Sequence, residues 1–265
     1  MGCCFPYWGG KFISRSEGEI REVVVSLCRN LKLLTMKRYD LFFVLAIVAI
    51  FLPFVLCEPL YEWYKEFNAT HGMIMSFIKF AVLSTMGEML GSRISMGKYI
   101  PTNFGVLPRM VVWGVLGMGI NMAMIIFSKG TPMFMEYMGM ENAVECFVAE
   151  GFTMDKLWVA LAVSVSMNTI FAPVFMTLHK ITDAHIAANG GSLKALVTPI
   201  PMAERFAASN WQAQWGFVFK KTIPLFWYPA HTITFLLPAE QRVLFAALLG
   251  IALGVLLALS SKKGK

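Results

Sequence analysis

The sequence of 265 residues has few charged residues and lacks the motifs of the common enzyme classes. Asp, Glu, Lys and Arg together make up 15% of the chain. It contains no GxSxG nucleophile elbow, no phosphate-binding Walker loop and no HExxH zinc motif. The five cysteines include no CxxC pair, which argues against a zinc ribbon or a thioredoxin-type redox site. We therefore expect no enzymatic activity, no catalytic residues, no metal and no cofactor.

The amino terminus also lacks a recognisable cleavable signal peptide. The first long apolar run begins only at Leu41 and is not followed by a small-residue cleavage site. Cys3 and Cys4 follow Met1-Gly2, as in doubly acylated proteins, but Pro6 stands where the myristoylation pattern has Ser or Thr. Whether the amino terminus is lipidated stays open.

What the chain has in excess is apolar sequence. Hydrophobic residues make up 57% of it, aromatic residues 14%, and the mean hydropathy is +0.62. Such a composition is typical of a protein that lies in a lipid bilayer. Six apolar segments are candidate membrane spans, namely 41–57, 73–90, 106–127, 157–178, 222–237 and 243–259. The sequence thus predicts an all-α, polytopic membrane helix bundle over residues 41–261.

Charge alternates between the connecting segments and predicts an orientation. Residues 1–40, the loop at 179–221 and the tail 262–265 are basic, whereas the loops after the first and third spans are acidic. Because Lys and Arg accumulate on the cytoplasmic side, both termini are expected in the cytoplasm, with six crossings between them. The net charge of +7 then reflects contact with anionic lipid and not with nucleic acid.

The basic segment before the first span has a helical period. Residues 17–38 carry a stripe of apolar side chains spaced three and four apart: Ile20, Val24, Leu27, Leu31 and Leu34. This pattern predicts an amphipathic helix on the cytoplasmic membrane surface, where it would bind anionic lipid. A short coiled-coil contact with a protein partner is the alternative.

Two cysteines and a glycosylation motif are predicted on the non-cytoplasmic side. Cys57 and Cys146 would share that compartment, so a disulfide can form there if the space is oxidising and the residues lie close enough. The sequon Asn68-Ala69-Thr70 matters only in a secretory host, and it lies too near the membrane for ready use.

Several polar side chains interrupt the apolar spans. Lys79 and Glu88 lie in the second span, nine residues and half a turn out of phase, so each needs a partner elsewhere or a polar cavity. The candidate pore-lining residues are Lys79, Glu88, Asn121, Ser164, Asn168, His231 and Thr234. Two interpretations stay open, namely hydrogen bonds between helices and a solvated path through the bundle.

Two groups of residues resemble metal ligands without completing a site. His179, Asp183 and His185 have suitable spacing, but with no fourth ligand nearby we interpret them as a solvated helix end. Met133, Met135, Met138 and Met140 form a thioether cluster that suits Cu(I). Methionine is frequent throughout the chain, so copper transport is only a minor alternative.

The last span carries small residues at every fourth position, namely Ala246, Gly250, Gly254 and Ala258. Such a stripe allows another helix backbone to come close, in the manner of right-handed membrane crossings. It would pack helices within the chain, or protomers of a homo-oligomer.

Three patches resemble the Mpv-seventeen / peroxisomal-membrane-protein-twenty-two family. Trp227, Phe235, Pro238 and Arg242 match its carboxy-terminal signature, with His231 where Gln is usual and Thr234 where Asn is usual. The stretch Asn168-x-x-Phe171-Ala172-Pro173 is similar to the Asp-Gln-x-x-Phe-Ala-Pro of the family, with Met167 in place of Asp. Gly87-Glu88-x-x-x-Ser92 is similar to Gly-Asp-x-x-x-Gln. The resemblance covers about residues 73–261, and the first span is an addition.

The resemblance implies a channel or a modulator of membrane permeability for small solutes, without catalytic residues. Members of the family lie in mitochondrial inner, peroxisomal and vacuolar membranes, with relatives in bacteria, where the cytoplasmic membrane would be the location. The alternative function is a non-conducting scaffold whose residues 17–38 recruit a cytoplasmic partner or anionic lipid.

Overall fold

The computed structural model describes residues 38–263. The predicted amphipathic segment at 17–38 therefore lies outside the described residues except for Arg38, as do the amino-terminal cysteines and the last two residues of the basic tail. The scaffold function, the anionic-lipid contact and the lipidation question all rest on those residues and stay predictions.

Every regular element among residues 38–263 is helical, which confirms the all-α prediction for this part of the chain. In chain order the elements are α2 (Arg38–Leu56), α3 (Glu58–Thr70), α4 (Gly72–Met96), α5 (Val106–Tyr137), α6 (Ala143–Val148), α7 (Met154–Ala188), η1 (Leu193–Leu196), α8 (Met202–Ala207), α9 (Trp211–Ala213), η2 (Gln214–Trp227), α10 (Tyr228–Leu236) and α11 (Ala239–Lys263).

Four of the described helices, α2, α4, α5 and α7, are long and apolar enough to cross a membrane. They correspond to the first four predicted spans, and they indicate an integral membrane protein in a lipid bilayer. The fifth predicted span, 222–237, is not one regular helix, because it is divided between η2 and α10. The sixth corresponds to α11, many of whose side chains beyond residue 252 lie outside the described set.

Local backbone signals mark the ends of the long helices. Gly97 adopts φ +77° after α4 and donates its N–H to the Arg93 carbonyl, a left-handed cap that favours glycine. Thr153 caps the start of α7, where its hydroxyl oxygen accepts the Lys156 N–H at 3.1 Å. At its other end α7 continues to Ala188, ten residues beyond the predicted end at 178.

The chain divides into two compact units, residues 1–63 and 64–265. The described part of the first unit consists of α2 and the start of α3. No residue of α2 is buried, and its apolar side chains are largely exposed. Such a helix needs lipid or another protein surface around it, because water would contact its apolar side chains on every face.

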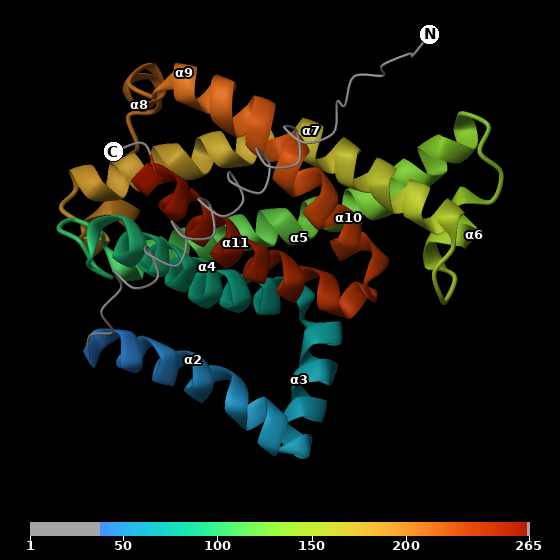
Figure 1. The fold of residues 1–265 in the computed structure, drawn as a ribbon, viewed down its shortest axis with the longest axis horizontal. Helices are drawn as coiled ribbons and strands as arrows, with labels where there is room; N and C mark the ends of the chain where they lie inside the picture. The colour runs from blue at the N-terminus through green and yellow to red at the C-terminus, as the bar shows by residue number, and fades with distance from the viewer. Residues whose placement is uncertain (1–37, 264–265) are drawn as a thin grey trace, which may run out of the picture. The chain divides into compact units, whose positions relative to one another are not determined.

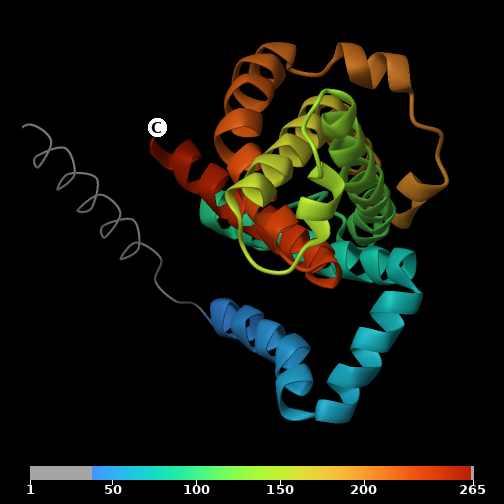
Figure 2. The same cartoon turned by 90° about the vertical axis from the view of Figure 1, so that its right-hand side faces the viewer.

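The second unit is a bundle in which α4 packs against both α5 and α11, α5 packs against α7, and α7 packs against α10 (Figures 1 and 2). Glycines allow the closest approaches. A Cβ on Gly117 would come within 2.4 Å of the Cβ of Phe80, and one on Gly254 would come within 3.2 Å of the Gly87 carbonyl oxygen. The α4–α5 and α4–α11 contacts therefore depend on bare backbone at these positions.

The segment before α10 is wound in π-type turns over fourteen residues, an uncommon geometry. It passes into α10 at Tyr228, and Ser164 of α7 stabilises this junction by donating its hydroxyl to the Tyr228 carbonyl at 2.8 Å. The same carbonyl accepts the Thr232 hydroxyl at 2.7 Å. The wide turns bring Trp227 to the inner side of the bundle, where it lines a cavity.

Candidate functional site

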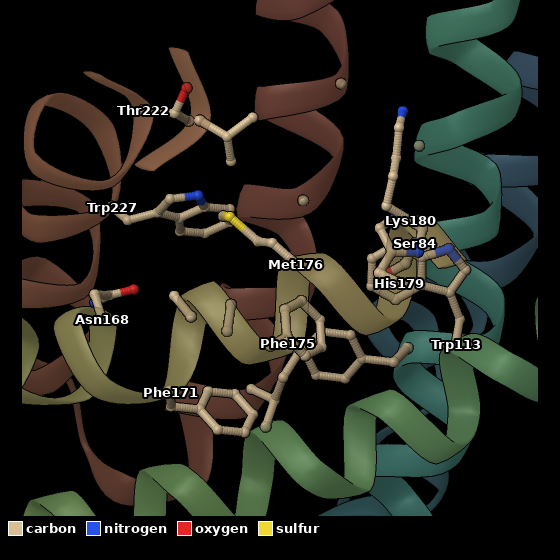
Figure 3. Close-up of a pocket in the computed structure, with 18 of the residues that line it drawn as sticks. Ser84, Trp113, Asn168, Phe171, Phe175, Met176, His179, Lys180, Thr222 and Trp227 are labelled. Carbon is tan, nitrogen blue, oxygen red and sulfur yellow. The ribbon is translucent and has the colours of Figure 1, made fainter. Parts of the chain in front are cut away.

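A half-open cavity of about 330 Å³ lies in the second unit, lined by residues of α4, α5, α7, η2, α10 and α11 (Figure 3). All six elements contribute lining residues. At roughly 30 Å³ per water molecule, this volume corresponds to ~11 waters or to one small organic molecule. The cavity itself could not be predicted from the sequence, but the sequence analysis identified several of the polar residues that line it.

Most of the wall is apolar and aromatic. Phe171 and Phe175 of α7 stack with their ring centroids 5.6 Å apart, and Met176 follows on the same wall (Figure 3). Trp227 faces them from the opposite side. Walls of this kind favour an uncharged guest, because they offer little to replace the hydration of an ion.

His231 is the most isolated polar group of the cavity. The residue is 5% exposed, and neither ring nitrogen has a hydrogen-bond partner within the described part of the chain. Trp227 packs edge-on against it at a centroid distance of 5.0 Å, and Phe235 does so at 6.4 Å. An imidazole that is buried without a partner costs free energy, unless water or a guest in the cavity supplies the missing bond.

Four other lining residues share this property. The hydroxyl of Ser84 on α4, the indole N–H groups of Trp113 on α5 and Trp227 on η2, and Nδ1 of His179 on α7 are buried without a hydrogen-bond partner among the described residues. Asn168 of α7 donates to the Ser164 carbonyl at 2.8 Å, and its amide oxygen points toward the middle of the cavity (Figure 3). Hydrogen-bonding groups from five elements thus surround one largely apolar space.

A group of charged side chains closes one end of the cavity, where α4 ends, α5 begins and α7 ends. The guanidinium of Arg109 bridges the carboxylates of Glu88 and Asp183. His179 lies beside both carboxylates and packs against Trp113, with the two rings tilted by 48° and their centroids 4.4 Å apart. Glu88, Trp113 and His179 belong to the cavity lining.

This cluster corrects the interpretation of His179 and Asp183 as a solvated helix end. Their side chains are only 22% exposed, and they face charged partners from two other helices. His185, the third residue of that pattern, lies apart, with Nε2 at 3.2 Å from the Thr198 carbonyl oxygen. The sequence reasoning also missed Arg109, although an arginine inside a predicted span is a recognised signal for a buried partner.

Three of the seven candidate pore-lining residues, Glu88, Asn168 and His231, line the cavity. Lys79 does not. Its side chain is 6% exposed, donates a hydrogen bond to the Asn68 side-chain oxygen and lies 5.2 Å from the centroid of the Tyr64 ring. Lys79 thus joins α4 to α3, and its partner Asn68 is the acceptor residue of the sequon.

The other three candidates also make contacts away from the cavity. Asn121 of α5 donates to the Met73 sulfur at 3.4 Å, and Thr234 donates to the Ala230 carbonyl within α10 at 3.0 Å. Ser164 bonds the start of α10, as described above. The contacts of Asn121 and Ser164 correspond to the first of the two interpretations, hydrogen bonds between helices, whereas Thr234 bonds within its own helix.

The residues of the carboxy-terminal signature form one structural unit. Arg242, at the start of α11, donates from Nε to the Leu237 carbonyl at 3.0 Å and from Nη2 to the Phe235 carbonyl at 3.1 Å. Its guanidinium also lies 4.9 Å from the centroid of Phe147. Because Pro238 separates the two helices, Arg242 supplies the donors that the last carbonyls of α10 would otherwise lack.

The remaining motif residues lie along the cavity or at helix contacts. Phe171, Ala172 and Gly87 line the cavity, and Pro173 lies within α7, where its carbonyl accepts the Thr177 hydroxyl at 2.7 Å. In the small-residue stripe, Ala246, Gly250 and Gly254 line the cavity. The surroundings of Ala258 lie outside the described side chains.

Neither sulfur-containing group forms a ligand set among the described residues. Met133 and Met138 are exposed at the end of α5. Cys57 and Cys146 are both free. Copper binding and the disulfide stay predictions from the sequence.

No family model, no curated protein and no solved structure matches this chain. The functional argument therefore rests on the geometry of the cavity and of the charged cluster.

Proposed function

We propose that this protein is a polytopic membrane protein that lets small uncharged solutes pass through the cavity of its helical bundle. The observation that carries the proposal is the set of unpartnered polar groups in an apolar cavity, above all the buried imidazole of His231. Residue resemblance to the Mpv-seventeen / peroxisomal-membrane-protein-twenty-two family supports the same function. The charge pattern of the connecting segments supports cytoplasmic termini and six crossings.

The solute class follows from the lining. Apolar side chains cover most of the wall, so a bare ion would lose its hydration there without compensation. His231, Ser84 and Trp227 can hydrogen-bond a hydroxyl or carbonyl oxygen. Small polyols and amides combine such oxygens with no net charge, and molecules of this size fit about 330 Å³. We propose no enzymatic role.

The test is solute flux into proteoliposomes that contain the full chain, with urea and glycerol as probes and stopped-flow light scattering as the readout. His231→Phe replaces the imidazole with an aromatic phenyl ring and so removes both nitrogens. If His231 bonds the passing solute, the variant should change the flux ~2–10-fold, which corresponds to one hydrogen bond of ~0.5–1.5 kcal/mol. Ser164→Ala is the matched control, because Ser164 bonds α10 and does not line the cavity.

Two results would count against the proposal. The first is that liposomes with wild-type protein take up urea and glycerol no faster than empty liposomes. The second is that His231→Phe and Ser164→Ala change the flux equally. In the second case the effect would come from loosened helix packing and not from the lining of the cavity.

A further inference from the structure

Three metal-ligating atoms from two helices face one another beside the cavity. Nε2 of His179 lies 3.2 Å from Oε1 of Glu88 and 3.7 Å from Oδ2 of Asp183. The three residues offer ligand atoms that all lie within 4.8 Å of one another. The residues are partly buried, with side chains 19–22% exposed. His179 and Asp183 are one helical turn apart on α7, and Glu88 reaches them from α4.

Arg109 fixes the direction of both carboxylates. Its Nη1 contacts the other oxygens of the pair, Oε2 of Glu88 and Oδ1 of Asp183. Its own Nε donates to the Phe104 carbonyl at 2.7 Å, which holds the guanidinium in place. One oxygen of each carboxylate is therefore taken by Arg109, and the second oxygen of each is left beside the imidazole. Charged outer partners of this kind orient the ligands of metal sites.

The separations suit a shared ion. Ligand atoms bonded to one Zn²⁺ at ~2.1 Å lie ~3.4 Å apart in tetrahedral geometry. The two measured separations, 3.2 and 3.7 Å, lie on either side of that value. An imidazole nitrogen between two carboxylate oxygens needs either a hydrogen on Nε2, which it donates to them, or a metal ion between the three atoms. Arg109 already neutralises one of the two carboxylate charges, so a proton on His179 or a metal ion beside the imidazole would compensate the one that remains.

We propose that Glu88, His179 and Asp183 bind a divalent transition-metal ion of the Zn²⁺ class, with Arg109 as the outer partner of both carboxylates. One imidazole and two carboxylates suit Zn²⁺, Mn²⁺ or Fe²⁺, whereas Cu(I) prefers sulfur and Mg²⁺ or Ca²⁺ prefers oxygen alone. Glu88 and His179 also line the cavity, so a fourth coordination position opens toward it. The site goes beyond the proposed passage of solutes and does not depend on it.

Metal binding can be measured on the purified full chain in detergent. Zn²⁺ titrated by calorimetry should bind at one equivalent per chain, with release of a proton from the imidazole. Asp183→Asn and Glu88→Gln keep side-chain size and remove one charged ligand each. Loss of a residue that only orients a metal ligand typically weakens metal binding ~10–100-fold, so loss of a ligand itself should weaken Zn²⁺ binding by at least that factor. His71→Gln is the matched control, since this exposed imidazole pairs only with Thr70 and Phe67 among the described contacts.

X-ray absorption of the Zn²⁺-loaded wild type gives a second readout that needs no variant. The proposal expects one imidazole and otherwise oxygen ligands. Sulfur ligands, an affinity that both ligand variants leave unchanged, or equal loss in His71→Gln would overturn it. Absence of binding at micromolar Zn²⁺ would overturn it as well and would leave a proton as the species beside His179. None of these results depends on solute flux.

Discussion

Replacing Gly117 with alanine tests the close contact between α4 and α5. A Cβ at this position would lie 2.4 Å from the Cβ and 2.6 Å from the Cγ of Phe80. Ordinary carbon contacts are ~3.5–4.0 Å, so the two helices would have to separate by ~1 Å. A rotamer change cannot relieve the clash, because the Cβ of Phe80 is attached directly to the backbone of α4. Overpacking of this kind typically costs ~1–3 kcal/mol.

The same helix supplies a matched control. A methyl group added at Gly119 would have no neighbouring atom within 4 Å, so Gly119→Ala gains the ~1 kcal/mol helix preference of alanine without a clash. Since both variants share that gain, their difference isolates the α4–α5 contact. Thermal unfolding in one detergent should place Gly117→Ala ~2–12 °C below Gly119→Ala. Equal transition temperatures would refute the packing of α5 on α4 through Gly117.

Two other substitutions test single contacts. Arg242→Ala should lower the free energy of unfolding by ~1.5–3 kcal/mol, because the carbonyls of Phe235 and Leu237 lose charged donors. Arg242→Gln keeps an amide donor, so it should recover part of that loss in the same denaturation assay. Ser164→Ala should cost ~0.5–1.5 kcal/mol through the lost bond to the Tyr228 carbonyl. No change in either variant would mean that these bonds do not hold the ends of α10.

Hydropathy located the long helices in the sequence. Where a predicted boundary agrees with the structure, a local backbone signal explains the agreement. The third predicted span begins at Val106, as α5 does, because Gly105 before it adopts φ +67° and interrupts the helix. Its predicted end at 127 was too early. The helix continues past Lys129 and Pro132 to Tyr137. Hydropathy therefore marked the most apolar part of α5 and not the residue at which the helix ends.

The charged cluster could not be predicted from local pattern. His179 and Asp183 looked like a solvated end because sequence shows only their own helix. Their burial comes from Glu88 and Arg109, which precede Asp183 by 95 and 74 residues and meet it only in the folded bundle. Likewise, the sequence of residues 222–237 did not predict the π-type turns. Contacts with α7, such as the Ser164–Tyr228 hydrogen bond, hold their geometry.

The polar residues illustrate what pattern can and cannot decide. A rule that intramembrane polar groups face protein or water holds for all seven candidates, because each is bonded or lines the cavity. The rule does not separate the two cases. Lys79 and His231 both looked like pore residues, yet one joins α4 to α3 and the other lines the cavity. Only the positions of neighbouring helices distinguish a structural bond from a functional one.

The most direct test of the central claim is to fill the cavity. Met176→Trp adds bulk to the lining, whereas Val174→Trp adds the same side chain on the same helix at a residue that is 60% exposed. Glycerol flux should fall severalfold with Met176→Trp and stay at the wild-type rate with Val174→Trp, in proteoliposomes with equal protein content. Unchanged flux with Met176→Trp, in a chain that still folds, would contradict passage through this cavity.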